Sequence, residues 1–441
     1  MNLAVIKPLR EESSVPLFPR GSVFLFSLVI GLFFLWGMSN NLTDILVQQF
    51  KKSFDLTPMQ AQFVQTAVFV GYFCTALPMA IVMRRWGYKF GMLCGLILFG
   101  VGTLSFWPAA VMDRYSMMLL ALFLVGCGSA ALETAANPFV AQAGPPESSE
   151  RRLNLAQSFN PAGSIAGILA GTFFIFSGVE LSSSKVATMK LEGTYASYLH
   201  SELMRVVPTY VTLGGAVLLF AVLLTLTKFP ISLRPENDYA DERLVAELGA
   251  LLRMGQVRAA IIAQFCYCGA QISTWSAFIP YLKQYTHASE REAGLLLTGN
   301  LVALTVGRFL STSLMRWIRP TRMMATYALI NMLLVVLSVL HPGTIGAAAL
   351  VATSFFMSIM FPTIFAVGIR GLGHRTKVAG SLLVMSIVGG AVIPPLLGWV
   401  VRRSGSYAEG YGIMALCYLV ILIYALRSPT KLALSSVKRI H

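Results

Sequence analysis

Residues 115–143 read YSMMLLALFLVGCGSAALETAANPFVAQA, and the only charged side chain in this stretch is Glu133. A helix crosses a bilayer core of about 30 Å with about 20 predominantly apolar residues. The stretch is therefore long enough and apolar enough to span a membrane. Because an ionisable side chain inside such a span is costly, Glu133 marks a functional site by default.

Eleven further stretches of this kind lie on either side of it. The twelve predicted spans cover residues 22–50, 58–83, 90–112, 115–143, 153–178, 206–227, 258–285, 292–317, 322–340, 344–369, 377–401 and 408–426. Of the 441 residues, 56% are hydrophobic and only 12% are charged, whereas a soluble domain carries about 25% charged residues. This composition excludes a soluble enzyme and a disordered scaffold. We expect an all-α membrane protein with twelve transmembrane helices.

The net charge of +15 is explained by orientation in the membrane. If the N-terminus is cytoplasmic, 23 of the 34 Lys and Arg residues fall in inner segments and ten in outer ones, and Arg308 lies within a span. Cytoplasmic loops are enriched in Lys and Arg. The sequence therefore predicts a multi-pass protein of a bacterial inner membrane with both termini in the cytoplasm, and no nucleic-acid partner.

The longest inner connection divides the chain into two six-span halves. It contains the polar stretch 234–243 (RPENDYADER), followed by residues 244–254, which we expect to form a short amphipathic helix. Two halves of this kind are typical of secondary transporters, whose substrate site lies at the interface between the halves. The predicted organisation is an N-terminal tail (1–20), a six-helix bundle (21–227), a linker (228–257), a second six-helix bundle (258–427) and a C-terminal tail (428–441).

Two acidic side chains, Asp44 and Glu133, lie well within the predicted spans, and polar residues share a helix face with each. Asp44 follows Trp36 and Asn40 at intervals of four, and Asn41 flanks that face. Glu133 precedes Asn137 by four. Residues four apart on a helix are neighbours on its surface, so both faces are plausible linings of a polar cavity.

Other spans add polar or aromatic side chains. These are Gln157 and Asn160 in span 153–178, Tyr267, Gln271 and Trp275 in span 258–285, and Arg308 in span 292–317. For the amides, the alternative is interhelical hydrogen bonding, worth about 0.6 kcal/mol each. Arg308 either snorkels to the inner surface or faces a cavity, and the sequence leaves both open.

Amides, acids and aromatic rings together suit a neutral polyol, because hydroxyls pair with amides and carboxylates while a flat ring covers the C–H face. The five histidines map to loops, span ends or the tail, so no metal site is expected. No phosphate-binding GxxxxGK[ST] motif occurs, which makes an ion gradient the remaining energy source. A carboxylate in an apolar cavity disfavours its charged form and can carry a proton.

Five segments resemble the L-fucose permease family, sugar:proton symporters of the major facilitator superfamily. They are residues 33–50 (FFLWGMSNNLTDILVQQF), 132–140 (LETAANPFV), 152–160 (RLNLAQSFN), 263–276 (AQFCYCGAQISTWS) and 356–368 (FMSIMFPTIFAVG). The resemblance runs through about residues 20–427. It implies the superfamily fold of two six-helix bundles, a monomer without cofactor, and alternating access driven by the proton gradient.

The resemblance also implies roles for particular residues. Glu133 corresponds to the proton-linked acid, and Asp44 to an acid that lines the sugar cavity and takes part in coupling. The sugar contacts expected from the resemblance and from the helix faces are Trp36, Asn40, Asn41, Asn137, Gln157, Asn160, Tyr267, Gln271, Trp275, Arg308 and Phe361.

The chain departs from the family pattern at three places. Met360 and Phe361 stand where the family has a glutamine and a tyrosine, position 43 is Thr in place of Asn, and the segment 83–87 (MRRWG) lacks the acid usual between spans two and three. We therefore expect differences in sugar fit and in gate contacts. A glucose/galactose symporter of the same family stays an alternative, as do a non-transporting sugar receptor and an uncoupled facilitator.

Overall fold

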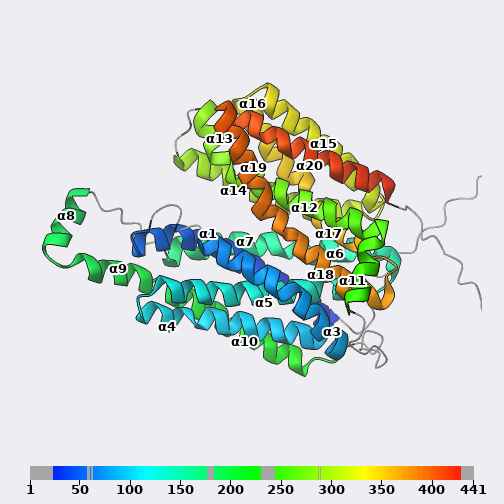
Figure 1. Cartoon of the computed structure of the whole chain (residues 1–441), viewed down its shortest axis with the longest axis horizontal. Helices are drawn as coiled ribbons and strands as arrows, with labels where there is room; N and C mark the ends of the chain where they lie inside the picture. Colours follow the sequence, from blue (N-terminus) through cyan, green and yellow to red (C-terminus); the bar gives the residue numbers. More distant parts are fainter. Residues whose placement is uncertain are drawn as a thin grey trace, which may run out of the picture.

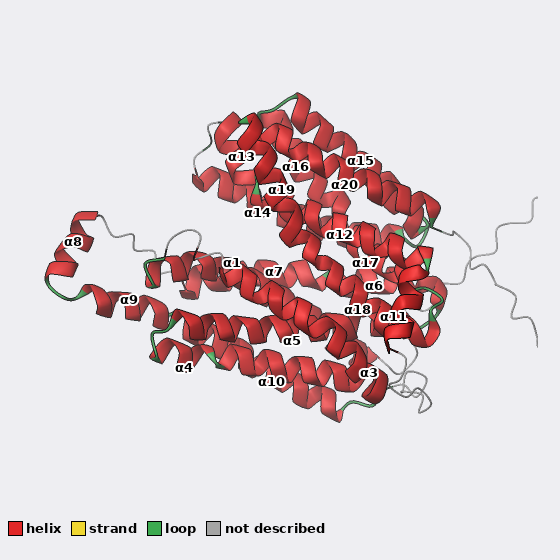
Figure 2. Cartoon of the chain, in the orientation of Figure 1, coloured by secondary structure: helices red, strands yellow, loops and turns green. Residues whose placement is uncertain are grey.

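The computed structural model describes residues 23–56, 60, 63–175, 183–229, 244–286, 288 and 290–428, and every regular element in these ranges is helical (Figure 2). The first half contains α1 (Val23–Ser53), α3 (Phe63–Leu104), α4 (Phe106–Val111), α5 (Tyr115–Gln142), α6 (Ser149–Gln157), α7 (Phe159–Ala170), α8 (Ser183–Leu191), α9 (Tyr195–Met204) and α10 (Val206–Leu226). A 3₁₀ turn at Pro146–Ser148 precedes α6, and a π-helical turn at Gly171–Ile175 follows α7.

The second half begins with the linker helix α11. Its helices are α11 (Leu244–Arg253), α12 (Gly255–Ser276), α13 (Phe278–Tyr285), α14 (Glu290–Leu314), α15 (Pro320–Leu340), α16 (Thr344–Met357), α17 (Met360–Gly368), α18 (Thr376–Met385), α19 (Gly389–Ser404) and α20 (Tyr407–Arg427). Short 3₁₀ turns at Gly373–Arg375 and Ser386–Val388 flank α18.

The prediction of twelve membrane-spanning helices is confirmed. Ten segments of the described chain are long and apolar enough to cross a bilayer. One of them, Phe63–Val111, has 49 residues, or about 73 Å at 1.5 Å per residue. It bends at Gly87, whose φ of 81° is not helical, and so makes two passes. The twelfth span consists of α12 and α13. Its polar residues explain why it is not among the ten apolar segments.

The surface of the described chain fits a lipid environment. Large apolar side chains such as Phe73, Phe173 and Leu219 are more than half exposed. Of the six tryptophans, Trp36 is buried and Trp275 is half-buried. The other four, all near helix ends or the Gly87 kink, are exposed: Trp86, Trp107, Trp317 and Trp399. Tryptophans at helix ends form the belt that anchors spans at the membrane surface.

The helices form two groups that touch chiefly at one end, which we call the linker end because α11 lies there (Figure 1). The carboxylate of Glu150 pairs with the guanidinium of Arg370 across the halves. Also across the halves, the Lys377 ammonium lies 5.4 Å from the centre of the Tyr88 ring. At the opposite end, α9 and α13 belong to groups whose ribbons diverge (Figure 1).

The predicted helix after the polar linker is confirmed as α11, one residue shorter than expected. Leu251 of α11 is fully buried, and Glu247 pairs with Arg84 of α3 at 2.7 Å. Arg84 belongs to the segment that lacks the family's usual acid. The linker helix therefore supplies an acidic partner to that segment.

Close packing of α1 against α7 sets the position of the residues near Trp36. Gly163 and Gly167 form a small-residue pair of the GxxxG kind, which lets two helix backbones approach closely. A side chain at Gly163 would clash with the Phe34 carbonyl, and one at Gly37 would clash with the Asn160 carbonyl. Only glycine at these positions allows the backbones of α1 and α7 to lie this close.

Candidate functional site

The first half contains a continuous buried polar cluster on α5 and α6. Glu133, Asn137 and Gln157 are 2%, 0% and 4% exposed. Gln157 Nε2 donates to Asn137 Oδ1 at 2.8 Å, and the Asn137 side chain lies beside the Glu133 carboxylate. The predicted one-turn spacing of Glu133 and Asn137 is thus realised, and the structure adds Gln157 to the same cluster.

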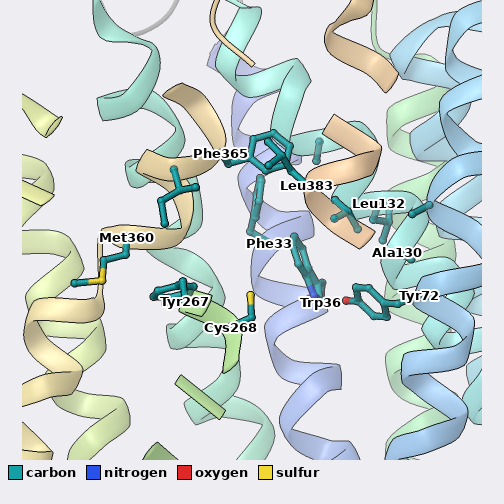
Figure 3. Close-up of a cluster of buried hydrophobic side chains, with 14 of the residues drawn as sticks. Phe33, Trp36, Tyr72, Ala130, Leu132, Tyr267, Cys268, Met360, Phe365 and Leu383 are labelled. Atoms are coloured by element: carbon teal, nitrogen blue, oxygen red, sulfur yellow. The ribbon is translucent and has the colours of Figure 1, made fainter. Parts of the chain in front are cut away.

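Tyr72 of α3 joins this cluster, although sequence reasoning did not select it. Its hydroxyl interacts with Glu133 and with Trp36 and Asn40 of α1. Figure 3 shows the Trp36 and Tyr72 side chains pointing toward one another. The sequence did contain a signal for Tyr72, since it is a tyrosine inside an apolar span. A buried tyrosine hydroxyl usually has a hydrogen-bond partner, so such a residue is a candidate for a polar cluster.

Arg152 is a second residue that sequence reasoning did not select, and it fixes the corner between α5 and α6. Its fully buried guanidinium donates to the carbonyls of Val140 and Ala141, each at 2.6 Å. These carbonyls lie at the C-terminal end of α5, where helix carbonyls lack partners within the helix. Because Arg152 ties α6 to that end, Gln157 on α6 reaches Asn137 on α5.

Arg308 lies in the interior, so the snorkelling alternative is wrong. Its side chain is 4% exposed, and its Nε donates to the Ser358 carbonyl at 2.5 Å. Its Nη1 donates across the halves to the Gln157 carbonyl at 2.8 Å. Both carbonyls lie where a span is interrupted, between α6 and α7 and between α16 and α17. A guanidinium satisfies these backbone groups, and interrupted spans of this kind are typical of transporter sites.

The second half contributes mainly aromatic side chains. Tyr267 of α12 is 1% exposed, and its ring centre lies 6.1 Å from that of Phe361. Tyr267 also interacts with Arg308. Gln271 is half-buried. Figure 3 places Tyr267, Cys268 and Met360 on the other side of α1 from Tyr72.

A short hydrogen-bond chain holds Trp275 of α12. Its Nε1 donates to Ser354 Oγ at 3.2 Å, and that hydroxyl donates to Asn300 Oδ1 at 2.7 Å. Ser354 and Asn300 are fully buried, whereas Trp275 is half-buried. The chain therefore fixes the indole edge of Trp275 against α14 and α16 and leaves part of the ring exposed.

The predicted residues of α1 and α7 lie close to each other. Trp36 is 4% exposed, and Asn40, Asn41 and Asn160 are half-buried. Asn160 Nδ2 donates to the Phe33 carbonyl at 3.4 Å, and Asn41 Nδ2 donates to its own helix. The backbone of Asp44 belongs to α1, but its side chain lies outside the described part of the chain.

The chemistry of the site follows from its charges. Within the described ranges Glu133 forms no ion pair, and no three His, Cys, Asp or Glu residues gather as metal ligands. A buried carboxylate without a cation beside it is the arrangement that takes up a proton, because burial disfavours its charged form. Amides and aromatic rings around it are suited to a neutral, hydroxyl-rich ligand.

Comparison with known proteins agrees with this description. The family model described as Major Facilitator Superfamily matches residues 28–394. The chain is 41% identical to the L-fucose-proton symporter of Escherichia coli K12 over 415 residues, 93% of this chain and 94% of that protein. It is 31% identical to the L-fucose-proton symporter of Haemophilus influenzae, over 91% of this chain and 96% of that protein. It is also 31% identical to a glucose/galactose transporter of Brucella abortus, over 95% and 97%.

Among solved structures, the chain is similar to the major facilitator superfamily transporter FucP in its outward conformation. The TM-score is 0.87 at 40% identity, covering 93% of this chain and 100% of that one. A proton:xylose symporter, XylE, shares the fold at a TM-score of 0.61 and 15% identity, over 92% and 95%.

Proposed function

The chain belongs to the major facilitator superfamily, and from that premise we propose that it is a proton-coupled symporter that imports a neutral monosaccharide, L-fucose, by alternating access. The observation that carries the proposal is the buried Glu133 carboxylate, which forms no ion pair with the described side chains and lies in a network of amides. Such a group can gain a proton on one side of the membrane and lose it on the other.

Two observations favour L-fucose over the glucose/galactose alternative. The chain is 41% identical to an L-fucose-proton symporter but 31% identical to a glucose/galactose transporter at similar coverage. The solved structure of FucP also matches at a TM-score of 0.87. The departure at Met360 and Phe361 remains, and it affects the aromatic wall next to Tyr267.

The orientation of the halves assigns a state in the transport cycle. The inner segments carry most of the Lys and Arg residues, which supports a cytoplasmic position for the linker end and both termini. The halves are tied there by Glu150 and Arg370 and by Lys377 and Tyr88. The described conformation is therefore closed toward the cytoplasm and corresponds to an outward-facing state.

The proposed roles follow the contacts. Glu133 binds the transported proton, and Asp44 couples the protonation state to sugar binding. Sugar hydroxyls pair with Asn40, Asn41, Gln157, Asn160, Gln271 and Arg308, and the apolar face of the sugar lies against Trp36, Tyr267, Trp275 and Phe361. Asn137 belongs to the same site and contacts Gln157 directly.

The wider organisation follows from the same proposal. Residues 21–227 and 258–427 form the two bundles, which move relative to each other, with 228–257 as the cytoplasmic linker and 1–20 and 428–441 as tails. Residues 1–20 and 429–441 and most of 228–243 lie outside the described part of the chain. The protein acts as a monomer in the bacterial inner membrane, with the proton gradient as its energy source and no cofactor or metal.

Uptake into proteoliposomes tests the proposal. Purified protein is reconstituted, and uptake of labelled L-fucose, D-galactose and D-glucose is measured with and without an inward proton gradient. The proposal predicts L-fucose accumulation that needs the gradient and that a protonophore abolishes. Preferred uptake of glucose or galactose would support the glucose/galactose alternative. Sugar flux that the protonophore does not reduce would indicate an uncoupled facilitator, and sugar binding without flux would indicate a receptor.

A further inference from the structure

Asn137 lies between the proposed proton site and the proposed sugar site. Its side chain is fully buried. Its Oδ1 accepts from Gln157 Nε2 at 2.8 Å. Its Nδ2 has no hydrogen-bond partner in the described part of the chain, and the carboxylate one helical turn away, beside this amide, is that of Glu133.

The two ends of the Asn137 amide are not equivalent. The NH₂ group donates and the oxygen accepts, so the amide orients by what it faces on each side. A buried donor without an acceptor is unfavourable. A charged carboxylate only accepts, and a hydrogen bond to a charged group is about twice as strong as one between neutral groups. The charged form of Glu133 therefore holds Nδ2 firmly and turns Oδ1 toward Gln157.

This orientation determines what Gln157 presents to a ligand. While its Nε2 donates to Asn137, its Oε1 remains as an acceptor for a sugar hydroxyl. The backbone carbonyl of Gln157 meanwhile accepts from Arg308 across the halves. Gln157 is thus connected to the proton site through its side chain and to the second half through its backbone.

Protonation of Glu133 weakens the hold on Asn137. The neutral acid has an O–H that donates, and its remaining oxygen is a weaker acceptor than a carboxylate. The Asn137 amide is then free to turn, and with it the donor and acceptor ends of Gln157. We propose that Asn137 is a positioning residue that transmits the protonation state of Glu133 to sugar binding by Gln157.

This inference rests on the proposed function. Other titratable groups face Glu133: Tyr72 from α3, and Cys268 from α12. Tyr72 leads toward Trp36 and Asn40 on α1, whereas within the described side chains Asn137 is the group that joins Glu133 to Gln157. The test must therefore change Asn137 without changing the two titratable neighbours.

Calorimetric titration of purified protein with L-fucose at pH 5.5 and pH 8 provides the test. Coupling between two ligands typically changes affinity by about 5-fold or more. We expect the wild-type Kd to differ between the two pH values by such a factor. In Asn137→Leu the protein still binds L-fucose, but the ratio of the two Kd values falls to within about twofold of one, since the coupling is lost.

Asn331→Leu is the matched control, because Asn331 is an equally buried amide on α15 outside the site. Its Kd ratio should equal that of the wild type. If Asn137→Leu does not fold, Gln157→Met breaks the same hydrogen bond from the other end. Its affinity falls at both pH values, and its Kd ratio must still collapse toward one.

The outcomes separate the inference from the proposed function. Suppose that binding depends on pH in the wild type. If this dependence persists in Asn137→Leu, or in Gln157→Met, the role of Asn137 is overturned and the proposed symport stays intact. Wild-type binding of L-fucose that does not change with pH overturns the inference together with the proposed coupling. Collapse of the ratio in these variants, but not in Asn331→Leu, supports the inference.

Discussion

The two halves of the protein build the site from different chemistry. The first half contributes the carboxylate of Glu133 and the hydrogen-bonded amides Asn137 and Gln157, all nearly or fully buried. The second half contributes the rings of Tyr267 and Phe361, the half-exposed indole of Trp275 and the cation Arg308. In the proposed site, this contrast puts the proton chemistry in the first half, whereas the second half supplies most of the aromatic rings that lie against the sugar.

If this division holds, changes at the proton site of the first half affect coupling, and changes at the aromatic rings of the second half affect affinity and selectivity. A carboxylate and an aromatic ring contribute to transport through different quantities, accumulation on the one hand and KM on the other. Substitutions in each half should therefore separate these two quantities. The following experiments examine this division in order of expected effect.

Asp44→Asn should have the largest effect. The proposed coupling acid would become a neutral amide of the same shape, and we expect both accumulation and exchange of L-fucose to be severely reduced. Uptake and counterflow in proteoliposomes measure the two activities. Rates like those of the wild type would remove Asp44 from the mechanism.

Glu133→Gln should abolish accumulation while exchange is at least partly retained. The glutamine keeps the shape and the hydrogen bonds of the neutral acid but cannot release a proton. One charge crossing 100 mV supplies about 2.3 kcal/mol, which corresponds to an about 50-fold concentration ratio. We expect wild-type accumulation of that order and a ratio near one in the variant, with labelled L-fucose still exchanging.

Trp275→Ala should raise the KM for L-fucose by about tenfold, since an aromatic contact of about 1.4 kcal/mol is lost. The accumulation ratio at saturating sugar should be unchanged, because Glu133 is intact. A loss of accumulation with unaltered KM would contradict the division between the halves.

Ser354→Ala should have a smaller effect of the same kind. It removes the acceptor for Trp275 Nε1, and one neutral hydrogen bond is worth about 1 kcal/mol. We expect KM to rise about fivefold. Ser338→Ala is the control, because Ser338 is equally buried but its hydroxyl bonds its own helix. An equal change in both variants would show a general packing effect.

Phe361→Tyr should have the smallest effect. It restores the family's hydroxyl at the aromatic wall beside Tyr267. We expect L-fucose uptake to change by about twofold, which is within the free energy of one added hydrogen bond. We also expect the preference among L-fucose, D-galactose and D-glucose to shift. Competition by each unlabelled sugar measures this preference, and an unchanged order would exclude Phe361 from selectivity.

The sequence predicts most of the fold because the bilayer imposes a length and a composition on each helix. The exception in hydropathy is α12, where polar residues such as Gln264 and Gln271 replace the apolar run. That span was still recognisable because charges are rare in it. The same polarity that weakens its apolar signal reflects its position at the interface between the halves.

The site was only partly predictable. Glu133 and Asn137 are one helical turn apart, so periodicity finds them. The partners of Tyr72 and Arg308 come from distant parts of the chain, and no spacing rule predicts such contacts. The partners of Arg152 are near in sequence, but they lie across the corner between α5 and α6, whose geometry no periodicity gives. The proposed outward-facing state was also not predictable, because opening and closing use the same helices and differ only in how the halves meet.

Proton movement that accompanies sugar entering proteoliposomes tests the central claim most directly. L-fucose is added to weakly buffered, de-energised vesicles that contain either the wild type or Glu133→Gln, and the external pH is recorded. Our account predicts alkalinisation with the wild type and none with Glu133→Gln, although the variant still exchanges labelled L-fucose. Alkalinisation by Glu133→Gln, or its absence in a wild type that transports L-fucose, would contradict the account.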